Sequence, residues 1–171
     1  MLFILLLVVF IATLLKSFSG ADHKTALGWK EYDEFKIEVG KWLRENASKD
    51  DKIAVNPAGI VPYYSELYSI DMLGLNNKII ARLGKKDFTQ AMGHQKGDGD
   101  YVLSLKPTYI FLGALSPEDY FQKEPKPPYP EVVFLGDKQI LSHPEFEKNY
   151  ELLTIPLENP RFKNFKIFVR K

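Results

Sequence analysis

The chain has no cysteine among its 171 residues, which excludes disulfide bonds, thiolate nucleophiles and cysteine-based metal sites. It also lacks an excess of either charge: 23 lysines and arginines stand against 22 aspartates and glutamates, and the formal net charge is +1. Because nucleic acids are bound by strongly basic faces, nucleic acid is not an expected partner. Only three histidines occur, and the spacing of His23, His94 and His143 fits no zinc site.

The signatures of several common enzyme classes are absent as well. There is no G-x-x-x-x-G-K phosphate loop and no serine in a nucleophile elbow. The segment "GDGDYV" (97–102) lacks the third glycine of the dinucleotide-binding fingerprint. It does contain an Asp-x-Asp pair, Asp98 and Asp100, but in a glycine-rich loop such residues more often cap a helix than bind a metal. We therefore expect no catalytic residue, no cofactor and no metal.

The one long apolar run is 1–15, interrupted only by Thr13. A membrane span needs about 20 apolar residues, so this run is short unless the residues after it extend it. Three interpretations remain open: a signal peptide cut after Ala21, a membrane anchor, or the end of a longer transmembrane helix. All three place the rest of the chain beside or beyond a membrane. We expect residues 1–20 to be a transmembrane helix or its C-terminal end, and residues 21–171 to be one extracytoplasmic domain.

Hydrophobic periodicity predicts an α/β fold for that domain. Apolar residues at three- and four-residue spacings, or near turn residues, predict helices at 29–47, 61–67, 77–83, 100–107 and 142–150. Short apolar runs predict strands at 52–56, 68–73, 108–113, 150–157 and 165–171. The expected sheet is small and mixed, mostly parallel with an antiparallel C-terminal pair, and helices flank it. A hydrophobic N-terminal helix precedes it.

Several boundaries depend on single residues. Asp98 or Asp100 is expected to cap the helix at 100–107. Ser142 is expected to cap the helix at 142–150. The segment "EVVFLG" (131–136) favours a strand, although a short helix also fits it. The proline-rich segment at 116–131 is typical of an exposed loop.

The candidate ligand site follows from the order of the first strands. Tyr63 and Tyr64 lie shortly after the first strand, and Asp71 lies within the second. Ligands of open α/β sheets bind beyond the carboxyl ends of the strands, where tyrosine rings and a carboxylate suit hydroxyl-rich ligands such as sugars. In the structural alternative, the tyrosines are packing residues and Asp71 accepts backbone hydrogen bonds from the turn at Gly74.

A carboxylate on a buried strand must be paired or solvated, because an isolated buried charge is costly. The basic residues expected to neutralise Asp71 are His94 and Lys96, from the loop "AMGHQKGDGDY" (91–101), or Arg82. The glycines of this loop permit tight turns. The predicted binding set is therefore Tyr63, Tyr64, Asp71, Arg82, His94 and Lys96.

The ordered series "GIVPYYS", "IDMLGLNNKIIAR", "GHQKGDGDYVLSLKP" and "YIFLG" resembles the C-terminal extracytoplasmic domain of membrane glycosyltransferases with the GT-C fold, in particular the bacterial group that includes the terminal arabinofuranosyltransferases. The resemblance covers residues 50–113 well and the remainder loosely. One departure is Asn77, which stands where the family pattern has an acidic residue.

The resemblance implies that the domain lies on the periplasmic side of a bacterial inner membrane and serves cell-envelope glycan synthesis. Enzymes of that family use a polyprenyl-phosphate sugar donor, and their catalytic acidic residue lies between transmembrane helices that this chain lacks. The expected function is therefore an accessory one, either glycan-binding or structural. The expected partners are the membrane, a glycan or polyprenyl-linked acceptor, and the transmembrane part of a glycosyltransferase.

Two other classes of function remain open from the sequence. The chain fits a free-standing secreted or membrane-anchored carbohydrate-binding envelope protein. It also fits a small hydrolase that uses Asp98, Asp100 and His94, although these residues form no recognised nucleophile arrangement.

Overall fold

The computed structural model describes residues 2–17, 20–90, 92–113, 134–162 and 164–171. They form two compact units, Met1–Glu34 and Phe35–Lys171, and each is described by itself. The predicted loop at 116–131 lies outside the described residues, as does the first half of the segment at 131–136.

The first unit is helical. It contains α1 (Leu2–Ser17) and the beginning of α2 (Gly20–Asn46). The side chains of residues 5–13 in α1 are exposed, and all but Ala12 and Thr13 are large and apolar. The Thr13 hydroxyl donates to carbonyl oxygens one turn back in the helix. Within the described ranges, we find no helix that is both long enough and apolar enough to cross a membrane.

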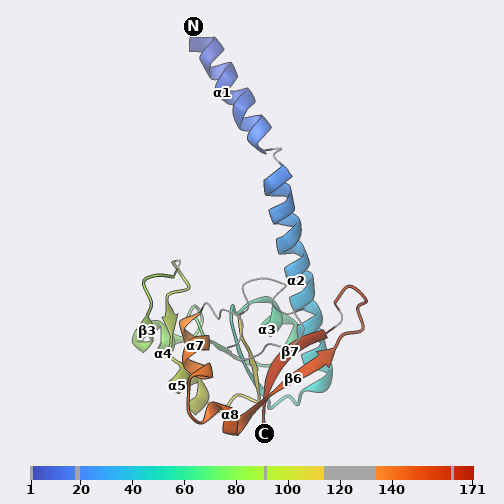
Figure 1. Cartoon of the computed structure of the whole chain (residues 1–171), viewed down its shortest axis with the longest axis vertical. Helices are drawn as coiled ribbons and strands as arrows, with labels where there is room; N and C mark the ends of the chain where they lie inside the picture. Colours follow the sequence, from blue (N-terminus) through green and yellow to red (C-terminus); the bar gives the residue numbers. More distant parts are fainter. Residues whose placement is uncertain (1, 18–19, 91, 114–133, 163) are drawn as a thin grey trace. The chain divides into compact units, whose positions relative to one another are not determined.

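The second unit contains a five-stranded mixed sheet (Figure 1). Its strands are β1 (Lys52–Val55), β2 (Tyr68–Asp71), β5 (Tyr109–Phe111), β6 (Tyr150–Pro156) and β7 (Asn164–Arg170). Their order in the sheet is β2-β1-β5-β7-β6. Strand β1 pairs in parallel with β2 and β5, whereas β7 pairs antiparallel with β5 and β6. The predicted α/β class is confirmed, including the antiparallel C-terminal pair.

Short helices and one small hairpin complete this unit. The helices are α3 (Ile60–Ser65), α4 (Lys78–Leu83), α5 (Gly99–Ser104), α7 (Leu135–Leu141) and α8 (Phe146–Asn149). The hairpin pairs β3 (Lys85–Lys86) with β4 (Lys96–Gly97).

Helices cover both faces of the sheet, because strand side chains alternate between the two faces. On one face, apolar side chains of the strands cluster with those of α4, α5, α7 and α8. The fully buried members of this cluster are Ala54, Ile70, Met72, Ile80, Val102, Ile110, Ile140 and Phe146. On the other face, α2 buries Phe35, Val39 and Leu43, and the Trp42 ring meets the Phe165 ring edge-to-face at 5.4 Å.

The connections that leave β1 and β2 run to opposite sides of β1 and define a switch point in the sheet. It passes from β1 through α3 to β2 on one side, and returns through α4 and α5 to β5 on the other side of β1. In open α/β sheets, the carboxyl ends of two strands that diverge in this way usually border the ligand crevice. Here those strands are β1 and β5.

Three helix ends can be compared with the caps predicted from the sequence. Asp98 caps α5, and its carboxylate accepts a hydrogen bond from the Tyr101 N–H at 3.0 Å, as predicted. Ser142 was predicted to begin a helix, but it ends α7, and Glu145 is the N-cap of α8. Asn77 caps α4 through its side-chain oxygen, a role that needs no negative charge.

Of the segment expected as a strand at 131–136, the structure describes Phe134, which is the N-cap of α7, and the first two residues of that helix. Helix α7 begins at Leu135, directly after Phe134. Its short apolar run imitates a strand in the sequence, because periodicity cannot separate a short strand from the first turn of a buried helix. The alternative of a short helix was therefore the right one for these residues.

Candidate functional site

Asp71 ends β2 and is only 3% exposed. Its Oδ1 accepts a hydrogen bond from the Leu73 N–H at 3.0 Å, and its Oδ2 accepts one from the Asn76 N–H. These bonds close the turn that leads to α4, in which Gly74 has a φ of 79°. Backbone N–H groups therefore solvate this carboxylate, as in the structural alternative.

The three basic residues expected beside Asp71 have other surroundings. The His94 ring stacks on the Phe134 ring, with 5.5 Å between centroids and 25° between planes. The Lys96 ammonium donates a hydrogen bond to the Ala81 carbonyl at the end of α4, and Arg82 is exposed on the same helix. None of the three makes a hydrogen bond or ion pair with Asp71 in the described part of the chain.

A carboxyl group that sequence reasoning missed occupies the switch point. Asp137, in the first turn of α7, is fully buried. It accepts hydrogen bonds from the Asn56 side-chain N–H, directly after β1, and from the Gly113 N–H at 2.9 Å, two residues after β5. Burial raises the pKa of Asp137 to about 7, although both hydrogen bonds act to lower it. The signal available in the sequence was an acidic residue placed for the first turn of a helix.

The network around Asp137 leaves one buried atom unpaired. The side-chain oxygen of Asn56 has no hydrogen-bond partner among the described residues. Turning the Asn56 amide over would not remove this, because its N–H groups would then take the unpaired position. A neutral Asp137 still has a carboxyl oxygen that accepts from the Gly113 N–H, and it places no charge in the interior.

Glycines allow α7 to fill this edge of the sheet. A Cβ atom at Gly97 would lie 2.3 Å from the Gly136 nitrogen, and one at Gly113 would lie 2.3 Å from the Phe134 ring. These contacts hold α7 against β4 and against the residues that follow β5. Asp137 and its neighbours therefore lie at the carboxyl ends of β1 and β5, where the fold rule predicts a ligand.

Tyr63 and Tyr64 lie on α3, which packs against α2. A Cβ atom at Gly40 would lie 2.6 Å from the Tyr64 Cβ, so this glycine permits the close approach of the two helices. One turn further along α2, Arg44 forms an ion pair with Glu66 at 3.1 Å. Tyr63 is 77% exposed, and its ring meets the Tyr64 ring edge-to-face at 5.2 Å. We call Tyr63, Tyr64, Arg44 and Glu66 the tyrosine surface.

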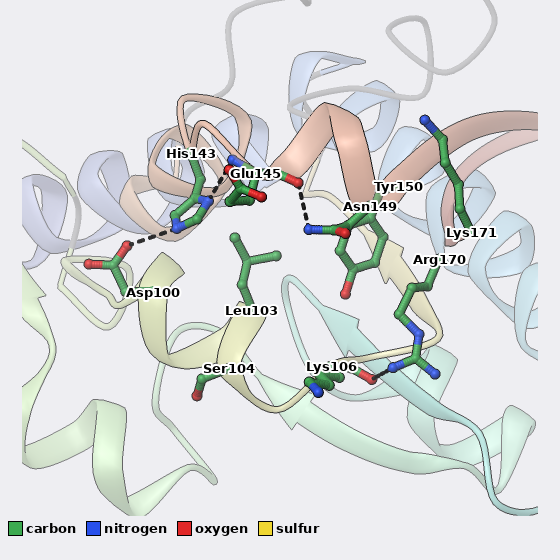
Figure 2. Close-up of a pocket in the computed structure, with 10 residues that line it drawn as sticks. All are labelled: Asp100, Leu103, Ser104, Lys106, His143, Glu145, Asn149, Tyr150, Arg170 and Lys171. Carbon is green, nitrogen blue, oxygen red and sulfur yellow. Dashed lines mark hydrogen bonds and ion pairs between the residues drawn. The ribbon is translucent and has the colours of Figure 1, made fainter.

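An open groove of about 630 Å³ lies at the opposite, amino-terminal edge of β1 and β5 (Figure 2). Its lining residues come from α5, the turn before β5, the segment 143–149, and the ends of β6 and β7. An adjoining hollow of about 590 Å³ shares Ser104, Lys106 and Arg170 with it. Sequence reasoning missed this groove because its residues are far apart in the chain and form no motif.

The residues suggested for a hydrolase do not assemble. Asp98 caps α5, and Asp100 faces His143 at 3.9 Å, whereas His94 stacks on Phe134. Within the described residues, no group of three or more histidine, aspartate or glutamate side chains is placed to hold a metal ion.

These observations define a small mixed α/β domain with a buried carboxyl network at its switch point. Residues 25–168 match the family described as Domain of unknown function (DUF8728). Because this match spans most of the chain, the chain belongs to that family. No curated protein and no solved structure is significantly similar to it.

Proposed function

We propose that this chain is an extracytoplasmic accessory domain of a polyprenyl-phosphate-sugar-dependent membrane glycosyltransferase that serves cell-envelope synthesis. In this proposal the chain binds the glycan acceptor and the catalytic acidic residue belongs to a membrane part outside it. The observation that carries the proposal is the tyrosine surface, where Tyr63 is 77% exposed.

The chemistry of the tyrosine surface suits a sugar. Tyrosine supplies a flat apolar ring and a hydroxyl group at low cost in conformational entropy, which is why it is enriched at binding surfaces. The C–H faces of a sugar ring pack on such a ring. Arg44 and Glu66 form an exposed ion pair, and such pairs contribute little to stability, so both groups are available to hydroxyl groups of a ligand.

A second surface supports the expected membrane partner. The turn before α4, the helix itself and the hairpin after it carry exposed large apolar side chains: Leu75, Ile79, Leu83, Phe88 and Met92. The cations in the same segment are Lys78, Arg82, Lys85 and Lys86. A surface that combines apolar and basic side chains suits the interface of a membrane with anionic lipids. In this proposal Arg82 faces lipid rather than the glycan.

The test is a titration of the full chain in a non-ionic detergent with envelope oligosaccharides, including arabinofuranose oligomers, followed by NMR. We expect Tyr63→Ala to weaken binding at least tenfold, because the exposed ring supplies most of the apolar contact. Phe88→Ala is the matched control, since Phe88 is also an aromatic residue with 75% exposure but lies outside the tyrosine surface. Equal loss in both variants, or no binding by the folded wild type, would count against the proposal.

A further inference from the structure

Side chains from three strands hold the turn between α5 and β5. Lys52 donates to the Leu105 carbonyl at 3.3 Å, Arg170 to the Lys106 carbonyl at 3.3 Å, and the Tyr150 hydroxyl to the Pro107 carbonyl at 3.0 Å. Lys106 has a φ of 49°, in the left-handed region that residues other than glycine rarely adopt. Such strain persists only where the surroundings impose it, and it gathers at functional sites. Here it fixes the backbone from which Lys106 extends at the groove.

The charges of the groove are unequally paired. Its glutamate, Glu145, is bonded at 2.7 Å to Lys148, which lowers the pKa of that carboxyl group. Lys106, in contrast, makes no hydrogen bond or ion pair through its ammonium group with any described residue. Arg170 donates one N–H to a carbonyl oxygen and makes no ion pair with a described residue. Asp50 and Asp51 line the adjoining hollow, but neither forms an ion pair with Lys106 or Arg170, so both cations can still pair with an anionic ligand.

At the other end of the groove, His143 has a defined tautomer. Its Nδ1 accepts a hydrogen bond from the Glu145 N–H at 3.2 Å, so in the neutral ring the proton is on Nε2. Nε2 lies 3.9 Å from Asp100, which is too far for a hydrogen bond. Figure 2 shows Leu103 and the Tyr150 ring between the two ends. The groove therefore has the His143 N–H donor at one end, the apolar side chains of Leu103 and Tyr150 in the middle, and Lys106 and Arg170 at the other end.

We propose that this groove binds a small molecule that carries a phosphate or carboxylate group. The anionic group lies against Lys106 and Arg170, and the apolar part of the molecule lies over Leu103 and the Tyr150 ring. The volume of about 630 Å³ is in the usual range for small-molecule sites. The inference is independent of the proposed glycan surface, because the two share no residue.

The test uses the full chain in a non-ionic detergent with three probes: phenyl phosphate, phenylacetate and the neutral benzamide. We expect one or both anionic probes to shift the NMR signals of Leu103, Lys106 and Arg170, and benzamide to bind at least tenfold more weakly. The preferred anion identifies the ligand class. Affinity for it should also fall as salt is raised, because the groove is exposed to solvent.

Lys106→Gln tests the residue itself. Glutamine must adopt the same left-handed backbone conformation as lysine at this position, so the variant removes the charge without relieving the strain. Loss of a charged hydrogen bond should weaken the anionic probe about tenfold. Lys78→Gln, a change of an exposed lysine outside the groove, should leave its affinity unchanged. Unchanged affinity in a folded Lys106→Gln variant, or no shift by either anion in the wild type, would overturn the proposal.

Discussion

The two edges of the sheet differ in whether their charged side chains are buried and paired or exposed. At the carboxyl edge, Asp71 and Asp137 are buried and are satisfied by backbone N–H groups and one side-chain amide. At the amino edge, Lys106 and Arg170 line an open groove. The rule that ligands bind at the carboxyl edge depends on space remaining there. In this domain the first turn of α7 lies at that edge, and the open groove described above lies at the other edge.

Polar groups have different roles at the two edges. Buried polar groups must be paired, and removal of one partner leaves the other unpaired at considerable cost. Exposed charges contribute little to stability and remain available to a ligand. Substitutions at the carboxyl edge should therefore change stability, whereas substitutions at the amino edge should mainly change binding.

The largest effect is expected for Asp137→Ala. This variant leaves the buried Gly113 N–H and the Asn56 amide without partners and opens a cavity, so the free energy of unfolding should fall by about 4 kcal/mol. Chemical denaturation of the full chain measures it. Asp137→Asn is the control: it keeps the volume of the side chain and one acceptor oxygen, so the loss should be smaller. If alanine were tolerated as well as asparagine, the carboxyl edge would not depend on this network.

The pH dependence of stability should differ between wild type and Asp137→Asn. The folded-state pKa of Asp137 is about 7, above the ordinary value of 3.8, so the folded state holds this proton more tightly than the unfolded state. The resulting stabilisation is fully present below the unfolded pKa and is lost as pH rises to about 7. Between pH 4 and pH 6.5 the wild type should lose about 3 kcal/mol relative to the asparagine variant.

Denaturation curves of both variants across this range measure that difference. Subtraction of the asparagine variant removes the effect of the other carboxyl groups, which are common to both proteins. Parallel curves would contradict a neutral Asp137 in the folded domain.

The smallest effect is expected for Lys106→Gly. Glycine adopts the left-handed backbone without steric cost, so this variant should gain up to about 1 kcal/mol in stability. It also loses the ammonium group, and in our account it binds the anionic probe more weakly. Thermal melts and the probe titration test the two effects separately. A variant that is both less stable and equally able to bind would contradict the assigned role of Lys106.

Local patterns predicted much of the fold. The apolar runs at 52–56 and 108–113 contain strands, and Asp98 caps its helix as expected, because strand hydrophobicity and N-capping depend on neighbouring residues. Helix α7 was harder to predict, because periodicity cannot separate a short strand from the first turn of a buried helix, and its packing against Gly97 joins segments distant in sequence.

The candidate site could be predicted less well than the fold. Asp71 was expected to be buried and satisfied, but the choice between basic side chains and backbone donors depends on the geometry of the turn after β2. Lys106 and Arg170 meet only because β5 and β7 are paired, a contact between segments about 60 residues apart that no local pattern carries.

An amide NMR titration of the full chain with envelope oligosaccharides tests most directly whether ligand contacts lie on the tyrosine surface while the carboxyl edge is structural. We expect shifts that cluster at Arg44, Tyr63, Tyr64 and Glu66 and leave Asp71 and Asp137 unchanged. Shifts centred on Asp71 and Asp137, or no shifts from a folded protein, would contradict this expectation.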